Sequence, residues 1–203
     1  MTALSTLNTR VKSYVKNVPS LMATQALSTA AREFFLKTRA WTEVQDVTLD
    51  AGDYDFEPTM ATGQEWVSID WMKVNGNVID PATFKIEPDF GRQSTPDYFG
   101  SNDAQSILVW PTPKEQVAIE VSLVLRPALN AKEVPDAQLA LFAEPIIHGA
   151  AAELLEQRGY PWYDPSRVPF HMGKFESGIQ DAHAAKLVSH TQASHAVRMR
   201  PMG

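Results

Sequence analysis

The chain has 203 residues, 44% of them hydrophobic and 21% charged, so it can bury a sizeable core and is not an intrinsically disordered protein. Its 18 basic and 24 acidic side chains give a net charge of −6, which argues against a dedicated nucleic-acid-binding protein. Cysteine is absent, which excludes disulfides, and we expect a soluble protein made in the cytoplasm without a signal peptide or a membrane-spanning helix.

The first forty residues predict helices. Apolar residues recur at helical spacing from Leu7 to Val15, and Ser20 is the expected N-cap of a second helix. This second helix carries an apolar stripe that we expect in the core. Its residues are Leu27, Ala30, Ala31, Phe34 and Phe35.

From Trp41 the apolar pattern changes to a period of two, which predicts about seven short strands of an antiparallel sheet. The expected strands include residues 44–49, 54–56, 66–71, 84–86, 106–110 and 117–125. Ala51-Gly52 predicts a turn, and Asn75-Gly76 predicts a tight hairpin because a type I′ turn needs positive φ at both central residues. This acidic part of the chain, residues 41–135, holds six basic against sixteen acidic side chains.

Helix returns after Val134, with a wide apolar face that extends to Leu155. Pro145 lies inside this pattern and predicts a kink or a restart, and Gly159 is expected to end the helix. Asp164-Pro165 predicts the N-cap and first residue of a last helix that reaches about His190. Its expected apolar residues are Phe170, Phe175, Ile179 and Ala182.

The order of elements predicts an α+β protein in which an antiparallel β-domain, a small sandwich or open barrel, is inserted into an α-helical bundle. We expect residues 1–41 to form the N-terminal helices of the bundle and residues 42–128 the inserted β-domain. Residues 129–190 then form the C-terminal helices, and residues 191–203 a flexible C-terminal segment without apolar periodicity.

Motifs for phosphate binding, for a nucleophilic serine and for a zinc protease are absent, and we predict no catalytic, cofactor-binding or metal-binding residues. The acidic string from Asp50 to Glu57 lacks the spacing of a calcium loop and is expected to face solvent. His148 is expected to be a hydrogen-bonded core or interface residue. Trp66, Trp71 and Trp110 are expected in the core or an interface rather than on sugars, with Trp66 and Trp71 on opposite faces of a regular strand.

Several segments in this order resemble one family. They are Ala26-Leu27, residues 30–35, 46–58 and 108–113, Arg126-Pro127, and residues 134–136, 146–150, 161–164 and 175–179. The chain resembles the head-to-tail adaptor proteins of tailed bacteriophages, the ring beneath the portal, including the tail tubular adaptors of short-tailed phages.

This resemblance implies a structural virion protein without catalytic residues. It implies a homo-oligomeric ring, commonly of twelve subunits, that joins the portal protein to a tail nozzle or tail-completion protein. The ring leaves a channel through which DNA passes without sequence-specific binding, and no membrane is involved.

Two sets of contact residues follow as hypotheses. The acidic Asp53, Asp55 and Glu57 of the inserted domain are expected to contact the tail side through a basic partner surface. The C-terminal segment is expected to be disordered in the free subunit and to become ordered on the portal. Its candidate portal-binding residues are Val197, Arg198, Met199, Arg200 and Met202.

Two functions from other classes stay open at this point. A cell-wall hydrolase that acts when the phage enters its host would need a substrate cleft with suitably spaced carboxylates. A sugar-binding receptor module would need exposed tryptophans on its strands.

Overall fold

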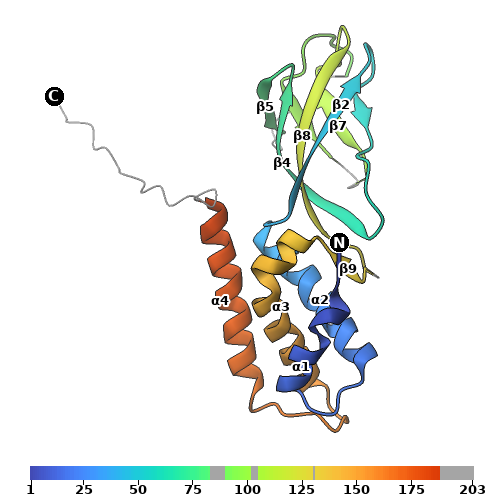
Figure 1. Ribbon diagram of the computed structural model, residues 1–203. Coiled ribbons are helices and arrows are strands. Elements are labelled where there is room, and N and C mark those ends of the chain that lie inside the picture. Colours follow the sequence, from blue (N-terminus) through green and yellow to red (C-terminus); the bar gives the residue numbers. More distant parts are fainter. Residues whose placement is uncertain (83–89, 102–104, 130, 188–203) are drawn as a thin grey trace, which may run out of the picture.

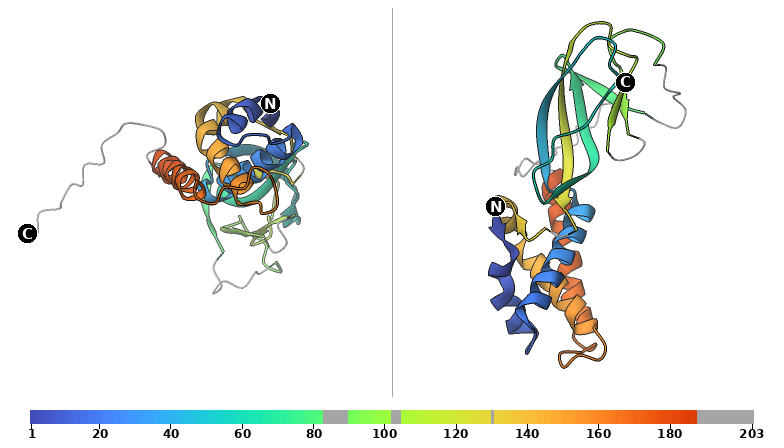
Figure 2. Two further views of the ribbon diagram at one scale, coloured as in Figure 1. Left: turned by 90° about the horizontal axis from the view of Figure 1, so that it is seen from below. Right: turned by 90° about the vertical axis from the view of Figure 1, so that its right-hand side faces the viewer.

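A computed structural model describes residues 1–82, 90–101, 105–129 and 131–187. Figure 1 shows the helices gathered at one end and the sheet at the other, and the turned views of Figure 2 agree. Within the described residues there are four α-helices packed together and a seven-stranded sheet, with two further short strands. The predicted α+β class is therefore confirmed.

The helices are bound together by aromatic side chains. They are α1 (Asn8–Tyr14), which follows a 3₁₀ turn η1 (Leu4–Leu7), α2 (Ser20–Thr38), α3 (Asp136–Glu156) and α4 (Val168–Leu187). The predicted apolar stripe of α2 is buried throughout. The Phe34 ring on α2 lies 5.1 Å from that of Phe142 on α3 and 6.2 Å from that of Phe175 on α4. The Phe34 side chain thus joins α2 to both α3 and α4.

Two predicted helix starts are displaced, one by a single residue and the other by three. Pro19, with extended backbone, occupies the N-cap of α2, and Ser20 is its first helical residue. The Ser20 hydroxyl instead accepts a hydrogen bond from Lys12 Nζ at 2.8 Å. Helix α4 begins at Val168 rather than at Pro165, because the Asp164 carboxylate accepts hydrogen bonds from the backbone and hydroxyl of Ser166 and holds a separate turn.

The restart predicted at Pro145 does not occur, since α3 runs through this residue without a break and ends at Glu156, before Gly159. The Pro145 ring packs against α4 at Gly178, where an added Cβ would lie 2.4 Å from Pro145 Cβ. Phe170 was also predicted in the core of α4 but is 59% exposed, whereas Phe175, Ile179 and Ala182 are buried as expected.

The sheet has the strand order β2-β8-β4-β5-β6-β7-β3. Its strands are β2 (Thr42–Leu49), β3 (Asp55–Phe56), β4 (Gln64–Val74), β5 (Asn77–Pro81), β6 (Tyr98–Gly100), β7 (Ile107–Trp110) and β8 (Val117–Pro127). Asn75 and Gly76 both have positive φ between β4 and β5, so the predicted hairpin is confirmed. The strand predicted at 84–86 lies outside the described residues.

One pair departs from the predicted antiparallel pattern. Strands β5 and β6 run parallel, because the long connection between them returns the chain to the end of the sheet where β5 began. The two short strands β1 (Thr2–Ala3) and β9 (Glu133–Val134) form a separate antiparallel pair beside the helices.

The Gln45 side chain nearly closes the sheet into a barrel. Strands β2 and β3 are the two outer strands of the sheet, and the chain that follows β3 passes along the free edge of β2. There the Gln45 amide donates to the Thr59 carbonyl at 2.7 Å and accepts from the Thr59 N–H at 3.1 Å. The amide group takes the place of a backbone partner, which satisfies part of an exposed strand edge.

The helices and the sheet are joined at two backbone crossings, residues 38–42 and 127–136, and by polar contacts beside them. Arg32 and Arg126 both pair with the Glu65 carboxylate, and Lys186 pairs with Asp70 at 3.0 Å. Partial burial works to raise the pKa of Glu65, but the hydrogen bonds and charges of the two arginines outweigh it and lower the pKa. The carboxylate therefore stays ionised in this joint.

Candidate interaction surfaces

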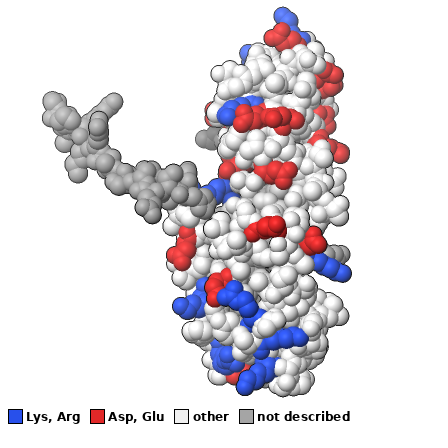
Figure 3. Space-filling model, viewed as in Figure 1, with Lys and Arg blue, Asp and Glu red and all other residues white. Residues whose placement is uncertain are grey.

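The predicted tail-side residues lie on the part of the sheet that points away from the helices. Asp53, Asp55 and Glu57 are all exposed, in the turn after β2 and along β3. Among the described residues none of these carboxylates has an ion-pair partner. Figure 3 shows Asp and Glu gathered over the sheet. Their charges are thus open to a partner.

The turn that carries these acids is held in place from the opposite loop. Asp50 accepts a hydrogen bond from the Gln116 amide at 2.8 Å, and the Gly52 N–H donates to the Pro113 carbonyl at 2.9 Å. Gly52 has a φ of 93°, which favours glycine. The acidic surface is therefore presented on a fixed turn rather than on a loose loop.

The strand tryptophans serve the core more than the surface. Trp110 is 4% exposed and Trp66 packs against the hydrophobic core. Trp71 is covered by Lys73, whose Nζ lies 4.4 Å from the ring centroid. Two register shifts in β4, on either side of Ser68-Ile69, interrupt the regular alternation that the sequence pattern assumed.

A buried histidine pair links α3 to α4. The Nδ1 atoms of His148 and His171 lie 2.8 Å apart, and both rings pack 5.1 Å from the ring of Tyr14. This confirms His148 as a hydrogen-bonded core residue. Nε2 of His171 is buried without a hydrogen-bond partner, which favours a proton on its Nδ1 that is donated to His148, because an unpaired N–H costs more than an unpaired lone pair.

This pair stays neutral near pH 7. Burial, together with the neighbouring His148 and Arg167, lowers the pKa of His171 to about 4. Burial also lowers the pKa of His148. The charge of Glu144 works to raise this pKa, and the charges of Lys174 and Arg10 work to lower it. Sequence reasoning identified His148 but missed its partner, since the two histidines lie on different helices.

An opposite shift occurs at Glu153 on α3. Burial, together with the charge of Glu33, raises the pKa of its half-buried carboxyl to about 7. The helices therefore contain a carboxyl whose pKa is raised and a histidine pair whose pKa values are lowered, so their contributions to the free energy of unfolding change with pH in opposite directions.

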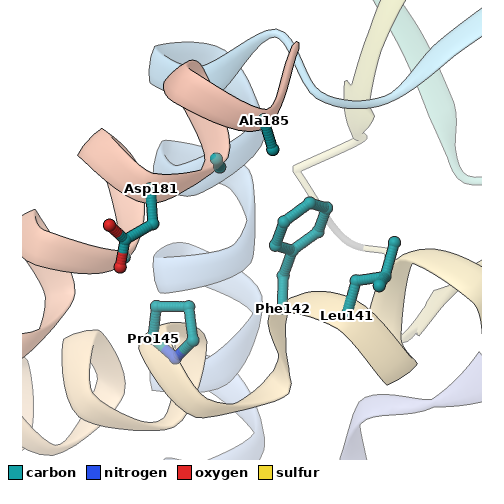
Figure 4. A pocket seen from close by; sticks show the side chains of 7 residues that line it. Leu141, Phe142, Pro145, Asp181 and Ala185 are labelled. Atoms are coloured by element: carbon teal, nitrogen blue, oxygen red, sulfur yellow. The ribbon is translucent and has the colours of Figure 1, made fainter. Parts of the chain in front are cut away.

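An open groove of about 280 Å³ lies between α3 and α4 (Figure 4). It is lined by Leu141, Phe142, Pro145, Gly178, Asp181, Ala182 and Ala185. Leu141 is 64% exposed at its edge, and Asp181 is the one ionisable side chain among these lining residues. Such a lining suits the packing of an apolar side chain and lacks the second titratable group that acid–base chemistry needs.

The predicted portal-binding residues Val197, Arg198, Met199, Arg200 and Met202 lie outside the described residues. In the part of the chain that the structure describes, no three His, Asp or Glu side chains gather into a possible metal site. No helix in that part is both long and apolar enough to cross a membrane.

Comparison with known proteins identifies the family. The model of the SU10 adaptor protein family matches residues 1–201, and the chain belongs to this family. No curated protein matches the chain. The resemblance to phage head-to-tail adaptors is thus confirmed over almost the whole length, and the protein has the structural role of a phage adaptor.

Proposed function

We propose that this chain, a member of the SU10 adaptor protein family, forms a homo-oligomeric ring of twelve subunits that links the portal to the tail of the virion. Large apolar side chains exposed on the helices support this proposal. Leu21 on α2 is 69% exposed and Leu141 on α3 is 64% exposed. Contacts between two different faces of neighbouring subunits close into a ring when the rotation permits.

The subunit is divided by task in this proposal. Residues 1–41 and 129–190 are the helical body that forms the ring. Residues 42–128 form the inserted β-domain, which contacts the nozzle or tail-completion protein through Asp53, Asp55 and Glu57. The ring leaves a channel for DNA, which passes without sequence-specific contacts, and the subunit is made in the host cytoplasm before assembly.

Residues 191–203 are the portal contact. Val197, Met199 and Met202 are apolar positions that can anchor in a groove of the portal, and Arg198 and Arg200 alternate with them as in an extended strand. Disorder in the free subunit would let this segment fold on its partner.

Native mass spectrometry of the protein mixed with its portal tests the ring, and many copies per complex are expected. Leu141→Glu should reduce the number of copies because it places a charge in an apolar contact. Val78→Glu is the control, since Val78 is 68% exposed on the sheet and should leave assembly intact. A protein that stays monomeric and never binds portal contradicts the proposal.

A truncation that ends at His190 tests the C-terminal segment. The truncated protein should keep its helical content by circular dichroism and lose binding to portal-containing heads. If it binds those heads as well as the full chain, the portal contact lies on the helices.

The triple variant Asp53→Asn, Asp55→Asn and Glu57→Gln tests the tail-side contact. Tail attachment should weaken, and its dependence on salt between about 50 and 200 mM should shrink. The variant Asp46→Asn, Asp80→Asn and Asp97→Asn removes as many exposed charges elsewhere on the sheet and should attach normally. Equal behaviour of the two variants would contradict the assigned surface.

Neither alternative function gains support from the described residues. A sugar-binding module needs open tryptophan faces, whereas Trp110 is buried and Trp71 is covered by Lys73. A hydrolase needs a pair of carboxylates across a substrate cleft, and the lining of the α3–α4 groove contains Asp181 alone. A second open groove on the sheet is lined by Asp46 and Glu120, but these lie directly opposite each other on the adjacent strands β2 and β8, and Glu120 is paired with Lys73.

A further inference from the structure

Basic side chains gather on the helices of this acidic protein. Arg10 on α1, Lys16 after α1, Arg167 before α4 and Lys174 on α4 are all exposed. Figure 3 shows Lys and Arg concentrated over the lower part of the helices, whereas Asp and Glu dominate over the sheet. We call these four residues the cationic helical surface.

The fold brings these residues together from distant parts of the sequence. Arg167 donates a hydrogen bond to the Tyr14 carbonyl at 2.8 Å, which ties the start of α4 to the end of α1 beside Lys16. The Tyr14 ring in turn packs on the buried His148–His171 pair. Arg10 and Lys174 act electrostatically on His148, and Arg167 acts on His171. Three of the four cations, Arg10, Arg167 and Lys174, therefore act on one buried pair, and Lys16 follows α1 close to Tyr14 in the sequence.

Most of this positive charge is not neutralised within the subunit. Arg10 pairs with Glu144 at 2.6 Å. Among the described residues, Lys16, Arg167 and Lys174 have no ion-pair partner. Three unpaired cations on one surface repel each other, and an anionic partner would relieve this repulsion.

An exposed aromatic ring lies inside the same surface. Phe170 is 59% exposed, and its ring centroid is 6.0 Å from that of His148 and 5.1 Å from that of His171. Arginine and large aromatic residues are enriched at protein–protein interfaces and dominate their binding energy. The phosphate backbone of duplex DNA offers no apolar surface for such a ring, so the composition favours a protein partner.

We propose that the cationic helical surface binds an acidic surface of another protein, with Phe170 as its apolar anchor and Lys16, Arg167 and Lys174 as the surrounding charges. This goes beyond the ring and the contacts proposed above and does not depend on them. Together with the acidic sheet it gives one subunit opposite charges in two regions, so each region rejects the partner of the other.

Fluorescence anisotropy with three labelled probes and the full chain at pH 7 tests this proposal. The probes are a peptide that alternates Glu and Leu, poly-glutamate and duplex DNA. The alternating peptide should bind best. The variant Lys16→Gln with Lys174→Gln should weaken its binding about fivefold, consistent with the loss of two exposed charge contacts. Lys114→Gln with Lys132→Gln removes two exposed lysines elsewhere and should leave binding within about twofold.

Phe170→Ala supplies the second arm. It should remove the preference for the Glu–Leu peptide over poly-glutamate while binding of poly-glutamate stays the same. An unchanged preference would overturn the anchor role, and equal behaviour of the two lysine variants would overturn the surface. Tighter binding of duplex DNA through Lys16 and Lys174 would assign the surface to nucleic acid instead.

Sedimentation at low salt separates a last alternative. Any self-association of the wild type should be unchanged in the variant Lys16→Gln with Lys174→Gln. If this variant instead abolishes self-association, the acidic partner is the sheet of a second copy, and the proposal of a different protein fails.

Discussion

The helices and the sheet of this subunit are stabilised in different ways. In the helices a few large rings contact one another across three elements, with Phe34 between Phe142 and Phe175. In the sheet single polar side chains complete the backbone pairing, as Gln45 does for Thr59 and as Asn75 does when it accepts from the Ala118 N–H at 3.0 Å. The comparison teaches that losing one of these rings in the helices should cost much, whereas losing one of these polar side chains in the sheet should cost little and act locally.

The largest effect is expected at Phe34. Phe34→Ala removes a fully buried ring that contacts three helices and should lower the free energy of unfolding by about 3–5 kcal/mol. Urea unfolding followed by circular dichroism measures this loss. Val44→Ala, at a position that is 52% exposed on β2, should cost less than about 0.5 kcal/mol. Similar losses for both variants would break the comparison.

The next effect concerns pH and arises in the helices. The pKa of His171 falls from 6.5 in the unfolded chain to about 4 in the fold, so the unfolded chain binds more protons between these values. The contribution of His171 to the free energy of unfolding is therefore fully present above about pH 6.5 and is lost as the pH falls toward 4. This loss is at most about 3 kcal/mol. Glu153 opposes it, because its pKa rises from 4.5 to about 7 and its contribution is lost as the pH rises.

Variants separate these two opposing contributions. In a Glu153→Gln background the free energy of unfolding should fall steadily from pH 6.5 to pH 4.5, and adding His148→Leu with His171→Leu should flatten this slope. His183→Leu removes an exposed histidine of α4 and should keep the slope. Urea titrations at a series of pH values measure it. A slope that persists without the buried pair would assign the pH response to other groups.

Two glycines of α4 give a smaller, paired test. Gly178→Ala forces a Cβ to within 2.4 Å of Pro145, a rigid ring, and should cost about 1–3 kcal/mol. At Gly173 an added Cβ meets nothing within 4 Å, so Gly173→Ala should stabilise the helix by up to about 1 kcal/mol. Thermal unfolding should thus shift in opposite directions. Shifts of the same sign would show that α3 and α4 can move apart to accept the methyl group.

The smallest effect is expected at the edge of the sheet. Gln45→Ala removes two hydrogen bonds to Thr59 and should lower the free energy of unfolding by about 1 kcal/mol. Hydrogen exchange of the Thr59 amide should speed up markedly while amides of α3 keep their rates. Gln180→Ala, at an exposed position of α4, is the control. Global loss of protection would mean that the barrel edge is as cooperative as the helices.

Local sequence patterns were enough to predict the elements and much of the core. The stripe from Leu27 to Phe35 has helical spacing, and Asn75-Gly76 satisfies the dihedral angles of one turn type. Patterns also predicted that Asp53, Asp55 and Glu57 face solvent, which is confirmed. In each case the cause lies within a few residues of the chain.

The features that the sequence did not reveal depend on distant partners. Strand β1 exists because Thr2 pairs with Val134, and His171 matters because it meets His148. Phe170 lies five residues before Phe175, whereas the buried face of α4 begins at His171 and continues through Phe175 and Ile179, so Phe170 lies beside that face and is exposed. The sequence therefore predicted which residues are apolar but not the surface on which Phe170 lies.

The joint between helices and sheet has a mechanical consequence. Both crossings, at residues 38–42 and 127–136, are continuous backbone that leads into the adjacent strands β2 and β8. A pulling force along the long axis is carried by the covalent backbone and, at the second crossing, by hydrogen bonds from the Leu4 N–H to the Lys132 carbonyl at 2.8 Å and from the Ser28 hydroxyl to the Ala131 carbonyl at 2.9 Å. A sideways force is instead carried by the pairs of Glu65 with Arg32 and Arg126 and of Lys186 with Asp70. Such a subunit is stiff under tension and compliant in bending. Higher salt should lower its resistance to bending, because it screens these ion pairs, and leave its resistance to tension unchanged.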